Sequence, residues 1–259
     1  MVPFTKASAC GNDFLIIEGA YAPAELGPLS RRLCDRHNGV GADGVEWLFP
    51  AEGADAQAHL INADGSEAEI SGNGTRCVAA YLVAAGKHGQ LLIHTGAGVK
   101  HCNLVSRNEM VFEFEMDMGK PEVGAEFSVT VASGKAKGTP VSMGNPHFVV
   151  FVSEFPALWQ ALGAEIGRDR SFPQGVNVEF VRLKSNNDID VRFYERGVGE
   201  TQSSGTGSCA AAVASIAGGL AKSPLTVHAP GGAQTVHWSD EEVSLRGPAQ
   251  LICRGEFLG

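Results

Sequence analysis

The sequence carries little positive charge. Lysine and arginine number 20 against 29 acidic residues, the net charge is −9, and no basic cluster occurs. Proteins that bind nucleic acids or anionic membranes usually display such a cluster, so we expect neither partner. Charged residues occupy only 19% of the 259 positions, whereas 44% are hydrophobic. A disordered chain has the opposite balance, so the composition predicts a packed protein of one large or two smaller domains.

A long apolar run is also lacking. The longest stretch without charge, residues 201–221, contains glutamine, serine and glycine, and it indicates a buried helix rather than a membrane span. The opening residues hold no apolar segment of signal-peptide length. Six scattered cysteines form no C-x-x-C pair, and the eight histidines show no metal-ligand spacing with them. We therefore expect reduced thiols, a cytoplasmic location and no structural metal.

Glycine, in contrast, is abundant, and short glycine-containing motifs reveal an internal repeat. Ser71-Gly72-Asn73-Gly74 matches Ser204-Gly205-Thr206-Gly207 at an offset of 133 residues. The same offset relates three further pairs, namely Gly11-Asn12 with Gly144-Asn145, Gly44-Val45-Glu46 with Asn177-Val178-Glu179, and Asn62 with Glu195. Four matches in order, at an offset near half the chain length, indicate two copies of one fold. The alternative is coincidence among common glycine-containing words.

Each Ser-Gly-x-Gly segment precedes an alanine-rich apolar run, residues 75–86 and 208–219, which ends in glycine. A helix that is apolar on nearly all sides must be enclosed, and most other apolar segments have the character of strands. The sequence thus predicts an α/β (α+β) protein of two pseudo-symmetric halves, each with strands around a central buried helix. The N-terminal half is expected at 1–118 plus a C-terminal strand at about 249–259, and the C-terminal half at 119–248.

The two helix starts suggest a chemistry. A helix N-terminus offers unpaired N–H groups and a partial positive charge, which suit a carboxylate. Two such ends on one carboxylate would acidify the neighbouring Cα–H, because the developing enediolate charge falls on the donors. The reaction would then need a proton-handling group on each face of that carbon, and Ser71 and Ser204 occupy equivalent positions for it. Position alone favours a simpler role, in which each serine is the N-cap of its helix.

Longer motifs are more specific. They are Gly11-Asn12-Asp13-Phe14, GVGADG at 39–44, NADGSEAE at 62–69, GNGTRC at 72–77, GNPHFV at 144–149, GVNVEF at 175–180, YERGVGET at 194–201, GTGSC at 205–209 and GPAQLICRGEF at 247–257. Together they resemble the diaminopimelate epimerase family nearly from end to end. The resemblance implies a barrel-like, mostly antiparallel sheet around the central helix of each half. It also implies epimerisation of LL- to meso-diaminopimelate, in lysine and peptidoglycan biosynthesis, without pyridoxal phosphate, metal or other cofactor.

The resemblance further implies a set of site residues around a small amino-acid substrate. The expected backbone donors to the reacting α-carboxylate are Gly72, Asn73, Gly205 and Thr206. The expected ligands of the distal carboxylate are Asn62, Asn177 and Arg196, with further polar contacts from Asn12 and Asn145. Glu195 and His147 match positions that flank the catalytic pair, and Gly44 stands where the family can carry glutamine.

Two of these residues have a competing interpretation. For Arg196 the alternative is a surface ion pair, although a guanidinium suits planar carboxylate recognition better. For His147 a purely structural role is nearly as compatible with the sequence. The oligomeric state stays open, and a homodimer is compatible with the sequence.

One departure from the family is large. The two catalytic residues of the family are cysteines, and their positions fall on Ser71 and Ser204. A thiol has a pKa of ~8.5 and an alkoxide lies near ~15.7, so a serine base costs on the order of 10 kcal/mol more to form.

Three interpretations therefore stay open. The chain is a diaminopimelate epimerase with weak, altered or lost activity, which includes deliberate replacement of both cysteines. It is instead a divergent racemase, dehydratase or isomerase of the same superfamily that acts on another amino acid. In the third interpretation it binds diaminopimelate without turning it over.

Overall fold

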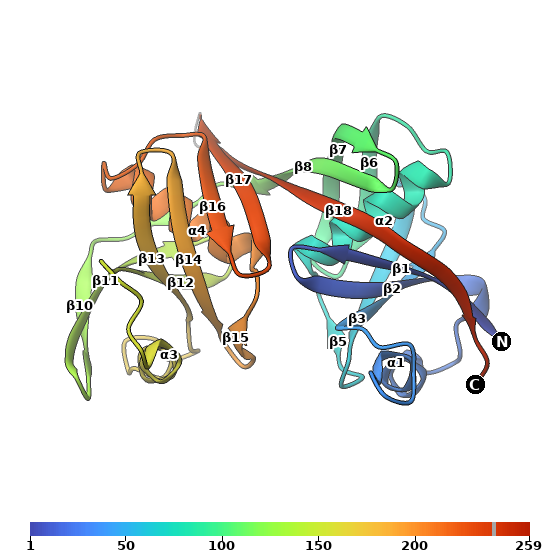
Figure 1. Cartoon of the computed structure of the whole chain (residues 1–259), viewed down its shortest axis with the longest axis horizontal. Coiled ribbons are helices and arrows are strands. Elements are labelled where there is room, and N and C mark those ends of the chain that lie inside the picture. Colours follow the sequence, from blue (N-terminus) through green and yellow to red (C-terminus); the bar gives the residue numbers. More distant parts are fainter. Residues whose placement is uncertain (240–241) are drawn as a thin grey trace. The chain divides into compact units, whose positions relative to one another are not determined.

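The computed structural model describes residues 1–239 and 242–259, and the chain forms two compact units (Figure 1). Unit 1 comprises Met1–Met116 and Gly247–Gly259, and unit 2 comprises Asp117–Arg246. The two boundaries fall within strands β8 (Val111–Gly119) and β18 (Glu242–Phe257), so each of these strands contributes residues to both units.

Unit 1 is a closed barrel around a helix. Its remaining elements are β1 (Val2–Ala9), β2 (Asn12–Glu18), a 3-10 turn (Gly19–Tyr21), α1 (Leu26–Cys34), β3 (Gly44–Phe49), β4 (Ala56–Asn62), β5 (Glu67–Ala68), α2 (Gly72–Ala84), β6 (Gln90–Thr95) and β7 (Gly98–Asn108). Eight strands pair in the cyclic order β1-β2-β3-β4-β6-β7-β8-β18, and β18 returns to β1. Helix α2 contacts β1, β2, β4, β6 and β7, so it lies inside the ring of strands.

Unit 2 repeats this plan around α4 (Gly205–Ala217). Its other elements are β9 (Glu122–Val123), β10 (Phe127–Val131), β11 (Gly134–Ser142), β12 (Pro146–Phe151), α3 (Trp159–Gly167), β13 (Asn177–Ser185), β14 (Asp188–Glu195), β15 (Gly199–Thr201), β16 (Leu225–Ala229) and β17 (Gly232–Ser239). The parallel pairs correspond between the units, because β2 with β3 and β4 with β6 match β12 with β13 and β14 with β16. The antiparallel pairs also correspond, among them β1 with β2, β3 with β4 and β6 with β7 in unit 1, and β11 with β12, β13 with β14 and β16 with β17 in unit 2.

The central helices confirm the predicted pair of buried helices. Both span 13 residues at the offset of 133, and α1 and α3 span nine residues each at the same offset. Alanines on α4, among them Ala210, Ala211 and Ala212, are fully buried. Such small side chains let the surrounding strands approach the helix closely on all sides. The two-half, barrel-and-helix fold expected from the sequence is therefore confirmed.

The sequence analysis missed the two shorter helices. Gly27 and Pro28 stand within the first turn of α1, and α3 contains Gly163, so both segments contain residues of low helix propensity. Gly163 is instead a packing residue, since a Cβ there would lie 2.7 Å from the Cβ of Tyr194. Within residues 1–239 and 242–259, no helix is long and apolar enough to cross a membrane.

Candidate active site

Ser71 and Ser204 are the N-caps of the two central helices. Each has an extended backbone, and its Oγ accepts a hydrogen bond from the N–H three residues on, at 3.1 Å from Gly74 and 3.2 Å from Gly207. This confirms the capping role that position alone favoured. The bond uses a lone pair of the hydroxyl oxygen and leaves the hydroxyl hydrogen available. A serine in this setting can therefore cap its helix and still donate a proton.

An asparagine at or just before the start of a neighbouring strand contacts the first turn of each central helix. Asn73 Nδ2 donates to Asn12 Oδ1 at 2.7 Å in unit 1, and Asn145 Nδ2 donates to Thr206 Oγ1 at 3.4 Å in unit 2. These pairs are equivalent under the offset of 133. The structure thus brings together the expected α-carboxylate donors and the expected polar contacts within each unit.

A buried cation supports the helix start of unit 1. Arg76 is fully buried on α2, and its guanidinium donates to Asn73 Oδ1 and, at 3.3 Å, to the carbonyl of Pro248. Its Nη1 has no hydrogen-bond partner among the described residues. An uncompensated guanidinium and the helix dipole both favour an anion at this end of α2. Sequence reasoning missed Arg76, which stands next to Cys77 inside an otherwise apolar helix.

In unit 2 the equivalent region holds a coupled acid–base pair. His147 Nδ1 lies 2.7 Å from Glu179 Oε1, and His147 Nε2 lies 2.9 Å from Asn145 Oδ1. Both side chains of the pair are buried, with His147 and Glu179 each 1% exposed. Burial raises the pKa of Glu179, and the adjacent imidazole opposes that rise. Because Asn145 Oδ1 can only accept, Nε2 must carry a proton, and the pair then shares one further proton between Nδ1 and the carboxylate.

The residues expected at the distal carboxylate lie at strand ends. In unit 2, Asn177 Oδ1 accepts from the Arg196 backbone N–H at 2.9 Å, and the Arg196 guanidinium donates to the carbonyl of Gln174 at 3.0 Å. In unit 1, Asn62 and Gly44 are paired across β4 and β3, and Asn62 Nδ2 donates to Ser66 Oγ at 3.0 Å. Glu195 ends β14, half-buried, and its charge contributes to the raised pKa of Glu179.

Known proteins resemble this chain over nearly its whole length. The family model described as diaminopimelate epimerase matches residues 4–124 and 139–252. The chain belongs to the diaminopimelate epimerase family. It is 37% identical to a diaminopimelate epimerase of Halothermothrix orenii, with 98% of this chain and 97% of that protein aligned. It is 38% identical to one of Pelotomaculum thermopropionicum, with 98% of each aligned.

A solved structure extends the likeness to the fold. A phenazine biosynthesis protein of the PhzF family from Bacillus anthracis superposes with a TM-score of 0.74 at 16% identity, and the match covers 100% of this chain and 99% of that one. The diaminopimelate epimerase family thus shares its two-unit architecture with proteins of distant sequence.

This family member also carries two buried glutamates that sequence reasoning noted only as part of the repeat. Glu46 on β3 and Glu179 on β13 are 3% and 1% exposed. A Cβ on Gly74 would collide with Glu46 Oε1, and a Cβ on Gly207 would lie 2.9 Å from Glu179 Oε1. The second glycine of each Gly-x-Gly word therefore makes room for a carboxyl group beside the helix start. The signal that could have revealed both was a charged residue inside an otherwise buried strand, repeated at the offset of 133.

The close approach at Gly74 gives a stability prediction. We expect Gly74→Ala to lower the free energy of unfolding by about 1–3 kcal/mol, because the new methyl group must displace a buried carboxyl group. Gly72→Ala is the matched control in the same helical turn, since nothing lies within 4 Å of its Cβ position. That control should be neutral or slightly stabilising. Denaturant unfolding of both variants measures the difference, and equal stabilities would contradict the proposed packing.

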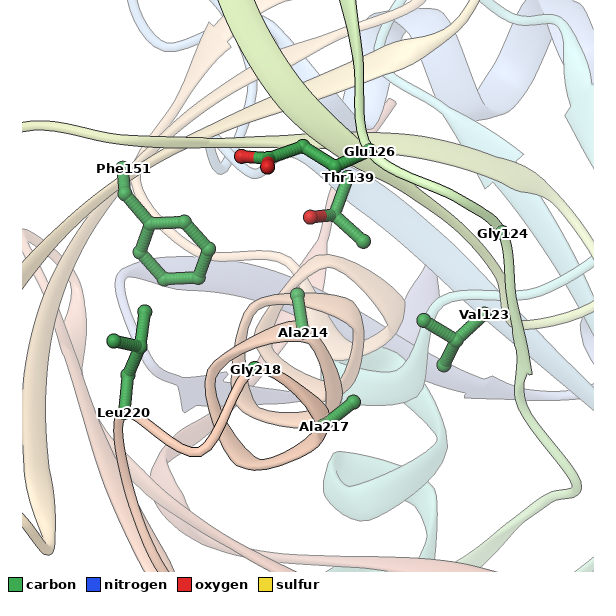
Figure 2. Close-up of a pocket in the computed structure, with 9 residues that line it drawn as sticks. All are labelled: Val123, Gly124, Glu126, Thr139, Phe151, Ala214, Ala217, Gly218 and Leu220. Atoms are coloured by element: carbon green, nitrogen blue, oxygen red, sulfur yellow. The ribbon is translucent and has the colours of Figure 1, made fainter.

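A cavity of about 380 Å³ in unit 2 is not this site (Figure 2). It is lined by Val123, Gly124, Glu126, Thr139, Phe151, Ala214, Ala217, Gly218 and Leu220. Ala214 and Ala217 are in the last turn of α4, whereas Ser204 caps its first turn. A helix of 13 residues is about 20 Å long. The cavity is mostly apolar, and the Glu126 carboxylate at its edge is paired with Lys137 at 2.6 Å.

Proposed function

We propose that this member of the diaminopimelate epimerase family is a cofactor-independent amino-acid epimerase, and that its substrate is diaminopimelate. The observation that carries the proposal is the duplicated helix start. In each unit a serine caps a buried helix, a Gly-x-Gly motif begins that helix, and an asparagine at or just before the start of a neighbouring strand hydrogen-bonds to its first turn. Such a duplicated arrangement suits a reaction that needs equivalent groups on two faces of one carbon.

In the proposed reaction the helix starts bind the α-carboxylate. The N–H groups of Gly72-Asn73 and Gly205-Thr206 donate to it, and they stabilise the enediolate that forms when the Cα proton leaves. Ser71 and Ser204 serve opposite faces of that carbon, one removing a proton while the other returns one. Their approach in a single cleft stays a prediction of the repeat.

The remaining site residues select and orient the substrate. Asn62, Asn177 and Arg196 bind the distal carboxylate, whose planar shape suits the guanidinium of Arg196. His147 and Glu195 place the amino group and assist proton transfer. A binding protein without turnover, or an isomerase of another amino acid, would bind its ligand with the same helix starts and polar side chains. The exposed Arg196, which follows the last residue of β14 and donates to the carbonyl of Gln174, supports a substrate with a second carboxylate.

Deuterium incorporation tests this function. We expect the Cα proton of both LL- and meso-diaminopimelate to exchange in heavy water, with interconversion of the two isomers, as followed by proton NMR and chiral chromatography. Loss of the signal without interconversion would indicate that only one face is active. Binding of diaminopimelate without exchange would establish a non-catalytic protein, and exchange of a different amino acid alone would reassign the substrate.

A further inference from the structure

Glu46 is a carboxyl group without an assigned task. It is 3% exposed on β3, and its side chain makes no hydrogen bond among residues 1–239 and 242–259. On the same strand Val45 and Trp47 pack into the core cluster beside α1, whereas Glu46 Oε1 lies against Gly74 in the first turn of α2. A buried, unpartnered carboxyl group is costly, so its position beside a helix start calls for a function.

Its neighbourhood includes the cap of that helix. The Cβ of Ser71 lies 3.3 Å from the point that a Cβ on Gly74 would occupy, and Glu46 Oε1 borders the same point. The hydroxymethyl group of Ser71 and the carboxyl group of Glu46 thus both border the Gly74 position, without a hydrogen bond between them in this structure. Ser71 Oγ accepts from Gly74, so its own hydrogen is free to move.

Unit 2 shows how such a carboxyl group is otherwise satisfied. Glu179, the equivalent of Glu46, has His147 at 2.7 Å. The residue equivalent to His147 in unit 1 is Phe14, which cannot share a proton. Glu46 therefore has no imidazole partner of its own, and Ser71 borders the same Gly74 position as its carboxyl group.

We propose that Glu46 holds the proton that Ser71 exchanges with the substrate, so that serine and buried carboxyl group together replace a thiol. When this face removes a proton, the Cα–H bond breaks, its proton moves to Ser71 Oγ, and the hydroxyl proton of Ser71 moves to the Glu46 carboxylate. The electron pair stays on the substrate as the enediolate. In the other direction Glu46 returns a proton to Oγ, and Ser71 delivers its own to Cα.

This relay removes the obstacle that serine presents. Burial raises the pKa of Glu46 from an ordinary value of 4.5 to about 8. A free thiol has a pKa of ~8.5, so the carboxylate is a base of similar strength. Because the two protons move together, Ser71 Oγ never carries a full negative charge, and the high pKa of an alkoxide does not enter.

Few other titratable groups act on Glu46. The residues paired with Glu46 on the two neighbouring strands are both apolar: Ile16 on β2 and Leu60 on β4. Helix α2 presents Cys77, a buried thiol whose pKa is raised, chiefly by burial. The charges that also act on that thiol are those of the adjacent Arg76, of Cys10 in the turn after β1, and of Asp13 on β2. Burial thus keeps the Cys77 thiol neutral at the pH near 8 where Glu46 titrates.

The inference rests on the proposed epimerase function, and its first test uses turnover. We expect Glu46→Gln to lower the inversion rate of diaminopimelate at least a hundredfold, roughly the size of a lost acid–base group, with little change in KM. The wild-type rate should rise with pH through about 8 in the direction where Ser71 removes the proton, and fall in the other, and Glu46→Gln should abolish both limbs. Glu52→Gln, in the exposed turn after β3, is the control with the same chemical change.

Restoration by a thiol separates a proton relay from a structural role. Ser71→Cys in the Glu46→Gln background should recover most of the lost rate, because a thiol needs no carboxyl group behind it. A Glu46→Gln variant with the wild-type rate and pH profile would overturn the proposal. So would a loss that Ser71→Cys does not recover in a variant that resists denaturant at least as well as the wild type.

A second measurement needs no turnover, so it decides the proposal even if diaminopimelate is not the substrate. The alkylation rate at position 71 is followed against pH by peptide mass spectrometry for Ser71→Cys with and without Glu46→Gln. With Glu46 present, the ionised carboxylate should raise the thiol pKa by roughly one unit or more relative to the glutamine variant. Identical titrations would show that Glu46 does not sense position 71 and would overturn the relay, whereas absence of turnover in the wild type would overturn the epimerase function alone.

Discussion

Replacing Ser71 and Ser204 together with glycine is expected to lower inversion of diaminopimelate by roughly a thousandfold or more, within the range of lost acid–base catalysis. Each single replacement should abolish inversion as well, yet preserve deuterium exchange in one of the two isomers. The reason is that the remaining serine still removes and returns the proton on its own face. Ser71→Gly and Ser204→Gly should therefore show opposite isomer preferences for exchange, as measured by proton NMR in heavy water.

Glycine is the informative replacement because it separates the two roles of each serine. Both residues are N-caps, and a Ser→Ala change at a cap costs about 1 kcal/mol, whereas glycine costs only a few tenths. The extended backbone at both positions suits glycine without strain. Thermal unfolding of the single variants should thus stay close to the wild type. Single variants that invert diaminopimelate normally would show that the hydroxyl groups only cap their helices.

The fold was predictable because its internal repeat involves positions at which few residue types fit. The Gly-x-Gly words keep the offset of 133 because a Cβ at Gly74 or Gly207 would meet a buried glutamate. The central helices were predictable because enclosure demands small apolar residues all round. In contrast, α1 and α3 span only nine residues each and contain glycine, with a proline as well in α1, so their helical propensity is weak.

The candidate site was predictable only for its residues in recurring motifs. Asn12, Asn145 and both serines belong to words that recur, whereas Arg76 and Glu46 are single charges inside apolar segments. Whether such a charge is paired depends on residues far away in sequence, such as Pro248 for Arg76. The contrast between Glu46 and Glu179 likewise rests on the exchange of phenylalanine for histidine one strand away. These contacts exist only after the barrel closes.

The buried Glu46 also predicts an unusual dependence of stability on pH. Its pKa is about 8 in the folded protein and near 4.5 when exposed, because burial disfavours the charged form. Between these values the folded protein binds more protons than the unfolded chain, so the free energy of unfolding falls as pH rises. The contribution is fully present below about 4.5 and is lost by about 8. The full difference corresponds to at most about 5 kcal/mol.

Glu46→Gln isolates this contribution because glutamine has a similar shape and no charge to bury. The variant should match the wild type near pH 5 and exceed it in unfolding free energy by several kcal/mol at pH 9, within the limit set by the pKa difference. Urea denaturation at matched pH values measures both proteins, and the His147–Glu179 pair cancels in the difference since both contain it. Glu52→Gln, exposed in the same unit, should give no such divergence. Parallel stability curves for Glu46→Gln and the wild type would mean that Glu46 is already ionised at neutral pH, and a carboxylate ionised there is too weak a base to replace a thiol behind Ser71.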